Sequence, residues 1–349
     1  MSATPTVRVV RVGQHLSLRF RSRSLLVGVG AAALAAAVAV LSISTGDVPV
    51  GPADLLRTLL GHGSPLDTFV VDQVRLPRVL TALLVGGALA LSGAVFQSLV
   101  RNPLGSPDML GFTQGAAAGA LVVIVVIGGG SAAIAGGAVV GGLVTGAVIY
   151  ALAWRHGVNG TRLILVGVGV AAFLSGINGY LLTRAQLQDA QSAMLWLTGD
   201  LDGADWGSAL PLLAALAVLV PVLLFGCGRA LRALELGDDT AAALGVRMSR
   251  QRMWLLVTAV LLASCAAAAA GPVSFVALTA PQLARRLTRA PGPNLLPSLT
   301  TGAALLVSAD WLAQRLIADN PLPVGVVTGV LGGGCLLWLL AAQRRAGRL

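Results

Sequence analysis

Long apolar runs separated by short polar segments are the feature of this chain that most restricts its fold. Several runs approach the ~20 residues that an α-helix needs to cross the ~30 Å hydrocarbon core of a bilayer. Only 11% of the 349 residues are charged, whereas roughly a quarter are charged in a water-soluble domain. Helices satisfy their backbone hydrogen bonds internally, as lipid requires. We therefore predict an all-α polytopic membrane protein and exclude a soluble globular one.

The apolar runs predict about ten transmembrane helices. They lie at 25–43, 77–98, 109–127, 131–153, 163–183, 208–227, 253–270, 271–287, 298–317 and 322–342. The run from Met253 to Ala284 is too long for one upright helix, which would measure about 48 Å at ~1.5 Å per residue. Gly271 and Pro272 near its centre favour a break. A hairpin there puts the flanking arginines on one face of the membrane, which supports two spans.

Topology explains the net charge of +10. Every basic residue is an arginine, and most arginines fall in segments on one side of the ten-span layout, while most acidic residues fall on the other. Because cytoplasmic segments are the arginine-rich ones, we predict a multi-pass protein of the cytoplasmic (inner) membrane with both termini cytoplasmic. The layout gives a basic arm at 1–24, a transmembrane domain at 25–342 with a long cytoplasmic loop at 228–252, and a cytoplasmic tail at 343–349. A nucleic-acid partner would require basic residues clustered on a soluble face, so none is predicted.

Reactive side chains are scarce within the predicted spans. No span contains histidine, and Asp310 lies toward the outer end of its span. Ion-driven carriers usually bury an ionisable group at mid-membrane, and an intramembrane protease needs a nucleophile beside a base. We predict no catalytic residue, no metal site and no cofactor bound by this chain. If the protein transports a substrate, the energy must come from elsewhere.

Two predicted cytoplasmic segments have distinctive sequences. Residues 101–111 contain two prolines and two glycines, which force a compact non-helical turn. At 234–246, Gly237 precedes Asp238 and Asp239, a pattern typical of a short helix with acids at its N-terminus. The first segment is explained by a structural turn alone. The second is compatible with docking to a soluble partner and with a solvated connector.

Arg75 and Arg78 stand at the predicted outer face, beside the start of the second span. Guanidinium groups form paired hydrogen bonds with carboxylates, so these arginines could hold an acidic partner protein. The alternative is that both side chains snorkel to the membrane interface. The predicted outer face is otherwise acidic, which makes the two arginines stand out.

Taken together, six segments resemble the FecCD family of ABC importer permeases, which serve uptake of iron-siderophores, haem and cobalamin. They are 75–120, 195–201, 234–246, 271–287, 308–316 and 322–333, and the likeness extends over about residues 25–342. The resemblance implies a type II ABC importer permease fold and a dimer with a copy or a paralogue. It also implies two cytoplasmic ABC ATPase subunits, which would bind ATP and Mg, and an extracytoplasmic substrate-binding protein.

The resemblance further implies roles for individual residues. Arg75 and Arg78 would dock acidic residues of the binding protein. The residues that couple the chain to the ATPase, within loop 228–252, would be Gly237, Asp238, Asp239, Ala241 and Gly245. The cytoplasmic gate would comprise Asn102, Leu104, Gly160 and Thr161.

Two departures from the family pattern bear on the cargo. Cobalamin-type members carry an arginine four residues after the aspartate that matches Asp310, whereas this chain has Gln314 there and Arg315 next. Many members have Pro-His where this chain has Pro-Gln, so we assign Gln282 no role. The Gln-Arg pattern is similar to ferric-siderophore permeases of the catecholate, enterobactin-like type. We predict ferric-siderophore import by alternating access; the alternatives are cobalamin or haem import and a stand-alone secondary carrier.

Overall fold

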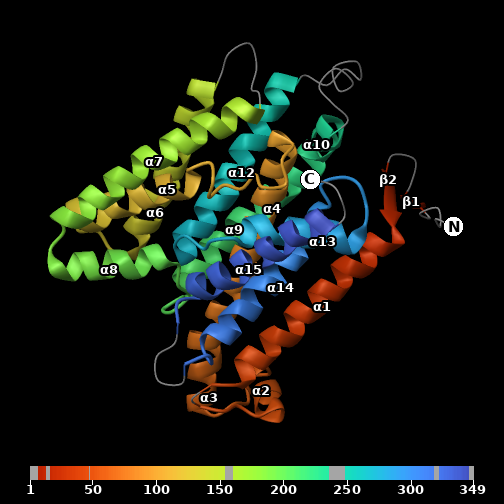
Figure 1. Ribbon diagram of the computed structural model, residues 1–349. Coiled ribbons are helices and arrows are strands. Elements are labelled where there is room, and N and C mark those ends of the chain that lie inside the picture. The colour runs from red at the N-terminus through yellow and green to blue at the C-terminus, as the bar shows by residue number, and fades with distance from the viewer. Residues whose placement is uncertain are drawn as a thin grey trace.

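The computed structural model describes residues 7–12, 16–46, 48–153, 160–235, 248–317 and 322–345, and these are mostly helical (Figure 1). The predicted all-α membrane fold is confirmed for this part of the chain, with one addition. Strands β1 (Val7–Val12) and β2 (Leu16–Arg21) form an antiparallel hairpin in which Val7 pairs with Arg21. The sequence analysis treated this segment only as a charged arm, although alternating apolar and polar residues are typical of a strand.

Helices of the first half are long and joined by short connections. They are α1 (Ser22–Ser44), α2 (Pro52–Leu59), α3 (Pro65–Phe69), the π-helical turn η1 (Val70–Arg75), α4 (Leu76–Val100), α5 (Phe112–Val122), the π-helical turn η2 (Val123–Ile127), α6 (Ser131–Ala153) and α7 (Gly160–Arg184). The chain has no helix between Arg101 and Gly111, as its prolines and glycines predict.

The second half begins with a short helix that the sequence analysis did not predict, α8 (Leu187–Thr198). The remaining helices are α9 (Trp206–Pro221), the π-helical turn η3 (Val222–Cys227), α10 (Gly228–Glu235), α12 (Met248–Ala270), α13 (Val276–Thr288), α14 (Leu295–Ala313) and α15 (Val324–Arg345).

Seven helical segments of the described chain are long and apolar enough to cross a membrane. They are 22–44, 65–100, 131–153, 160–184, 206–227, 250–270 and 295–313, and 112–127 and 324–338 are shorter apolar helices. With α13, these segments agree with the predicted number of about ten.

The core is built around α4 and α12, which lie centrally, with α5–α8 on one side and α13, α14 and α1 on the other (Figure 1). Within the apolar stretches of these helices, 83% of the residues are buried in α4 and 61% in α12, but only 17% in α7 and 11% in α1. The outer helices therefore present apolar faces that lipid or another membrane subunit must cover.

Glycines allow the central helices to approach closely. Gly86 of α4 lies against the backbone of Gly302 in α14, and Gly119 of α5 lies against that of Gly137 in α6. An added Cβ at any of these four positions would overlap the neighbouring helix. Such small-residue contacts are typical of membrane helix packing, where close van der Waals contact replaces the hydrophobic driving force that water supplies.

The predicted break at Gly271 is confirmed, but the returning segment is shorter than a full span. Gly271 has φ +66°, which glycine adopts without strain. Residues 271–275 form a bend between the end of α12 and the start of α13 at Val276. Because α13 has 13 residues, it is about 20 Å long at ~1.5 Å per residue, too short to cross the hydrocarbon core by itself.

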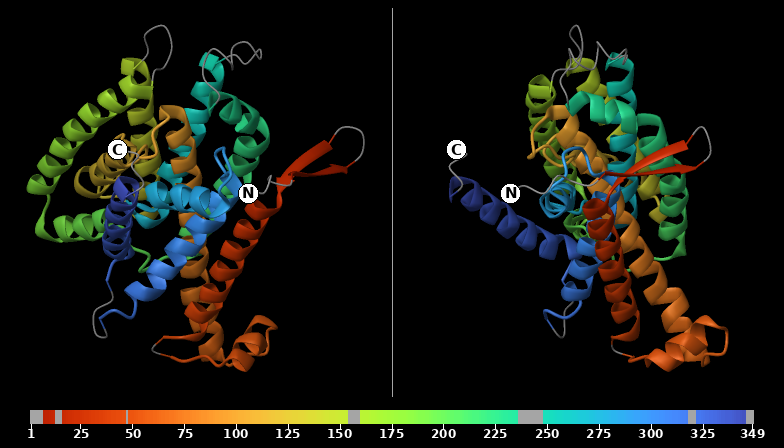
Figure 2. Two further views of the ribbon diagram at one scale, coloured as in Figure 1. Left: turned by 45° about the vertical axis from the view of Figure 1, so that its right-hand side comes forward. Right: turned by 90° about the vertical axis from the view of Figure 1, so that its right-hand side faces the viewer.

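The helix bundle has two ends, called the α2 end and the Val100 end. The α2 end carries α2, α3 and the first residues of α4, and the Val100 end carries the last residues of α4 and the first of α7. At its far end α15 projects away from the other helices, as Figure 2 (right) shows. Leu337 and Trp338 in that part of α15 are 71% and 59% exposed, so this helix also has an apolar surface to cover.

Candidate functional site

Arg75, a predicted docking residue, lies at the last position of η1 and binds the segment that follows α1. Its Nη1 donates to the carbonyl oxygen of Ile43 at 2.7 Å and its Nη2 to that of Val48 at 2.6 Å. A Cβ added to Gly46 would lie 2.6 Å from the same Nη2, so a glycine at this position makes room for the guanidinium. Arg75 is half-buried and fixes the connection between α1 and α2.

Arg78, the second predicted docking residue, joins two carboxylates from distant parts of the chain. Its Nη2 donates to Oδ1 of Asp310 at 2.9 Å, and its Nε lies 3.2 Å from both carboxylate oxygens of Asp310. Its Nη1 donates to Oδ1 of Asp202 at 3.0 Å. The Asp310 side chain is fully buried, that of Arg78 is 15% exposed and that of Asp202 is 69% exposed.

Asp310 has a further donor, since Gln314 Nε2 lies 2.7 Å from its second carboxylate oxygen. This explains physically how a carboxylate can stand within an apolar helix, because a buried charge must be paired and hydrogen-bonded. Arg78 and Arg75 are thus both engaged within the chain. Their assignment to binding-protein docking stays a prediction, and any docking partner has to share them with these internal acceptors.

Arg315, to which the sequence analysis assigned no docking role, lies at the same end of the bundle. Its Nη1 donates to the carbonyl oxygen of Trp311 at 3.1 Å, its Nη2 bonds the hydroxyl of Thr45, and its guanidinium carbon lies 4.7 Å from the Trp311 ring centroid. Arg75 at the end of η1 and Arg315 just after α14 therefore both hold the chain near the end of α1.

At the Val100 end, the predicted gate residues Asn102 and Leu104 occupy one tight turn. The Asn102 side-chain oxygen accepts the Leu104 N–H at 2.9 Å, and its carbonyl accepts the Gly105 N–H at 3.0 Å. Such local side-chain bonds are what favour asparagine in turns. Leu104 is 37% exposed, so an apolar side chain is presented at the surface of this loop.

Loop 101–111 is held by α13 and by Phe275, the residue before it. Gln282 Nε2 donates to the carbonyl oxygen of Pro103 at 2.7 Å. The Asp108 carboxylate accepts the Thr113 hydroxyl at 2.6 Å and the backbone N–H of Phe275. Desolvation raises the pKa of Asp108, and these two hydrogen bonds partly offset that rise. The loop is therefore a packed element, fixed by named contacts at its beginning and its end.

Gly160 and Thr161, the other predicted gate residues, are the first residues of α7. A Cβ added to Gly160 would lie 2.9 Å from the Cα of Val100, so the start of α7 touches the end of α4, next to Asn102. Further along α7, a Cβ on Gly167 would lie 2.9 Å from the carbonyl oxygen of Leu110. The structure thus brings α7 alongside loop 101–111, as a shared gate requires.

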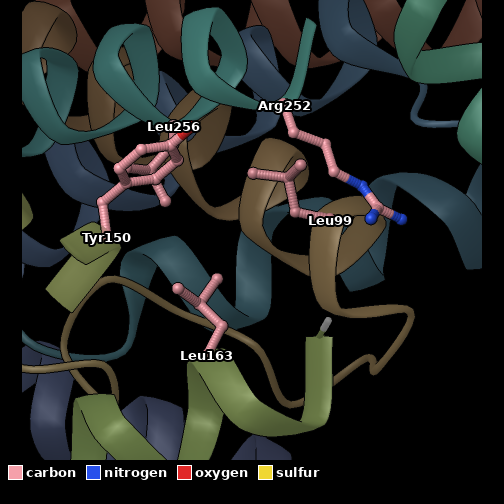
Figure 3. Close-up of a pocket in the computed structure, with 5 residues that line it drawn as sticks. All are labelled: Leu99, Tyr150, Leu163, Arg252 and Leu256. Carbon is pink, nitrogen blue, oxygen red and sulfur yellow. The ribbon is translucent and has the colours of Figure 1, made fainter. Parts of the chain in front are cut away.

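A small cavity of about 10 Å³ lies at this end among α4, α6, α7 and α12. It is lined by Leu99, Tyr150, Leu163, Arg252 and Leu256. Figure 3 shows the Tyr150 ring beside Leu256 and the Arg252 guanidinium pointing away from them past Leu99. A space of this size holds about one water molecule. The cavity is too small to admit an organic chelate.

The predicted coupling residues Gly237, Asp238, Asp239, Ala241 and Gly245 lie outside the described residues. Their flanks are described: α10 ends at Glu235 and α12 begins at Met248. Within the described parts of the chain, no three His, Cys, Asp or Glu side chains are grouped so as to hold a metal ion.

Sequence reasoning missed several polar contacts that organise these two ends. Asp310 was noted only for its position, and Gln282 was given no role. The buried Gln97 was not noted, although its Nε2 donates to the carbonyl oxygen of Leu278 at 3.1 Å and its side-chain oxygen accepts from Arg285. A signal was available, because ionisable and amide groups inside an apolar span require a partner.

Comparison with known proteins agrees with this geometry. Residues 34–342 match the FecCD transport family. The ferric enterobactin transport system permease protein of Escherichia coli is 44% identical over 303 residues, which cover 87% of this chain and 92% of that protein. The achromobactin transport system permease protein of Dickeya dadantii is 37% identical, covering 87% of each chain.

The fold also matches a solved structure of an inward-facing conformation of a proposed metal-chelate type ABC transporter. The TM-score is 0.80 at 28% identity, and the match covers 90% of this chain and 99% of that one. Both the sequence and the arrangement of helices are therefore shared along nearly the full length. This multi-pass membrane chain belongs to the FecCD transport family.

Proposed function

We propose that this chain is the membrane-spanning permease subunit of an ATP-driven ABC importer for a ferric siderophore. The observation that carries the proposal is the 44% identity, over 87% of the chain, to a ferric enterobactin permease. Relatives named for achromobactin and for Fe(3+) dicitrate match at 37% identity, which supports an iron chelate as the cargo class. Cobalamin and haem are the alternative cargoes.

The polar groups of the structure support transport by rearrangement rather than by chemistry on the cargo. The buried charges Arg78 and Asp310 neutralise each other, so they are not placed to bind a coupling ion. We infer that the chain binds no cofactor and that ATP and Mg are bound by two partner ATPase subunits. A secondary carrier, in contrast, would use an ionisable site that changes its occupant during transport.

In this proposal the Val100 end faces the cytoplasm and the α2 end faces outward, with both termini cytoplasmic. The arginines of the 228–252 segment and of the α13 C-terminus support this orientation through the positive-inside tendency. The ATPase would then contact the segment containing Gly237, Asp238, Asp239, Ala241 and Gly245. Its movements would reach the gate loop 101–111 through α12 and α13, because Gln282 of α13 and Phe275, which precedes α13, hold that loop.

The cargo path would lie between this permease and a second permease, either a copy or a paralogue. The apolar, open surfaces of α7 and α15 support that arrangement, because a second membrane chain can pack against them. An extracytoplasmic binding protein would deliver the chelate to the α2 end, where Arg75 and Arg78 stand.

The test is uptake of radioactive iron by a strain that lacks this chain. Ferric enterobactin, a ferric hydroxamate, ferric citrate, haem and labelled cobalamin are supplied separately under iron limitation. We expect the strain to lose catecholate-iron uptake and to keep cobalamin uptake. The wild-type chain should restore the uptake that was lost. Loss of cobalamin uptake with normal iron uptake would overturn the cargo assignment.

A further inference from the structure

The turn at 199–205, between α8 and α9, connects two other helices at the α2 end. The N–H of Asp200 donates to the carbonyl oxygen of Ala270, the last residue of α12, at 2.9 Å. The N–H of Gly325, near the start of α15, donates to the carbonyl oxygen of Gly199 at 2.9 Å. The turn therefore holds the C-terminus of α12 and the N-terminus of α15 in one place.

Glycines make this junction tight. A Cβ on Gly199 would lie 2.5 Å from the carbonyl oxygen of Pro272, and one on Gly271 would overlap the carbonyl oxygen of Trp196. Backbone thus packs directly on backbone where α12 turns toward α13. Since interiors this dense transmit displacement, a shift of the turn has to move the bend between α12 and α13.

A single ion pair attaches the same turn to the guanidinium at the start of α4. Asp202 accepts from Nη1 of Arg78 at 3.0 Å, and its own N–H donates to the Asp200 side chain at 3.1 Å, which orients the residue. Beside the turn, Trp206 at the start of α9 donates from Nε1 to the carbonyl oxygen of Asp72 at 2.8 Å.

The two carboxylates on Arg78 differ in their exposure to solvent. Asp310 is fully buried and shares two guanidinium nitrogens of Arg78, whereas Asp202 is 69% exposed and accepts from the third. Losing the buried partner would leave a desolvated charge unpaired, but losing the exposed one would not. The Asp310 pair is therefore permanent, and the Asp202 position is open to exchange.

We propose that a carboxylate of the docking binding protein replaces Asp202 on Nη1 of Arg78. The replacement frees the 199–205 turn from α4 while Asp310 keeps the guanidinium in place. The freed turn then moves the bend between α12 and α13, and α13 holds the gate loop. The partner is a protein that presents an aspartate or glutamate at this point of the α2 end. This inference rests on the proposed docking function and adds to it an internal competitor for the docking arginine.

The experiment compares Asp202→Asn with Asp205→Asn in the purified complex, reconstituted in nanodiscs and titrated with its binding protein. Asp205 is exposed, lies three residues further along and caps α9 through the N–H of Ser208 at 2.9 Å. Asparagine caps helices as well as aspartate does, so both variants lose one surface charge and keep the fold. Only Asp202→Asn removes a competitor from Arg78.

We expect Asp202→Asn to tighten binding about 1.4-fold to fivefold more than Asp205→Asn, the range for one exposed ion pair. Part of the difference should persist at ~0.5 M salt, because Asp202 contacts Nη1 directly, whereas the effect of separated surface charges is screened. Damage to the turn would instead weaken binding. Equal affinities of the two variants, or weaker binding by Asp202→Asn, would overturn the exchange while leaving docking intact. No binding by the wild-type complex would overturn the proposed docking function and this inference together.

Discussion

The pair formed by Arg78 and Asp310 should contribute more to stability than any surface charge at the α2 end. Asp310 is fully buried, and Arg78 reaches it through two nitrogens at 2.9 and 3.2 Å. In Arg78→Gln the carboxylate keeps Gln314 as a neutral donor but loses its cation. Removing one partner of a buried pair costs about 3–5 kcal/mol. We expect the free energy of unfolding to fall by that amount.

Two further variants separate charge from packing. Asp310→Asn in the Arg78→Gln background removes the unpaired charge and should recover about 2 kcal/mol, because neutralising both partners is far less damaging than removing one. Asp202→Asn removes an exposed partner and should change the unfolding free energy by less than about 1 kcal/mol.

The assay is reversible unfolding of the purified chain in mixed micelles of increasing SDS content, followed by the fluorescence of its six tryptophans. The loss of unfolding free energy should be largest for Arg78→Gln, smaller for the double variant and smallest for Asp202→Asn. A loss below about 1 kcal/mol for Arg78→Gln would refute the reasoning. So would a double variant whose loss is no smaller than that of Arg78→Gln, since neutralising Asp310 would then recover nothing.

Three other outcomes are expected. Gly93→Ala should sharply reduce the yield of monodisperse protein in gel filtration, because the added Cβ would overlap the carbonyl oxygen of Ala277 in α13. Gly169→Ala is the control and should behave like wild type, because the added Cβ would meet open space. In a titration at low salt, Arg75→Gln should weaken binding-protein docking roughly tenfold. Arg57→Gln should leave docking unchanged, and equal effects of the two variants would contradict the docking role of Arg75. Alanines at 238–239 should lower transport per ATP hydrolysed several-fold, and an unchanged ratio would exclude that segment from coupling.

Apolar periodicity predicted the membrane helices closely. The run at 131–153 coincides with α6, and 163–183 falls within α7. The break at Gly271 was also predictable, because two local signals agreed there: a Gly-Pro pair and arginines on both flanks. The 13-residue length of α13 was not, since no pattern shows that the bend continues to Phe275.

The candidate site was predicted in part. The sequence located the segments, including the compact loop after Arg101, but not the contacts made by their side chains. Arg78 and Asp310 are 232 residues apart, and no local rule joins residues across such a distance. The helix α8 was missed because its 12 residues mix polar and apolar side chains. Partners that are distant in sequence are found only when helices are packed in three dimensions.

The most direct measurement is uptake of radioactive ferric enterobactin by proteoliposomes of defined composition. One set contains this chain with its permease partner, the ATPase subunits and the binding protein; a second contains this chain alone. We predict uptake only in the first set, and only with ATP and Mg on the ATPase side. Accumulation of the chelate by vesicles that contain this chain alone, driven by an ion gradient, would contradict the account.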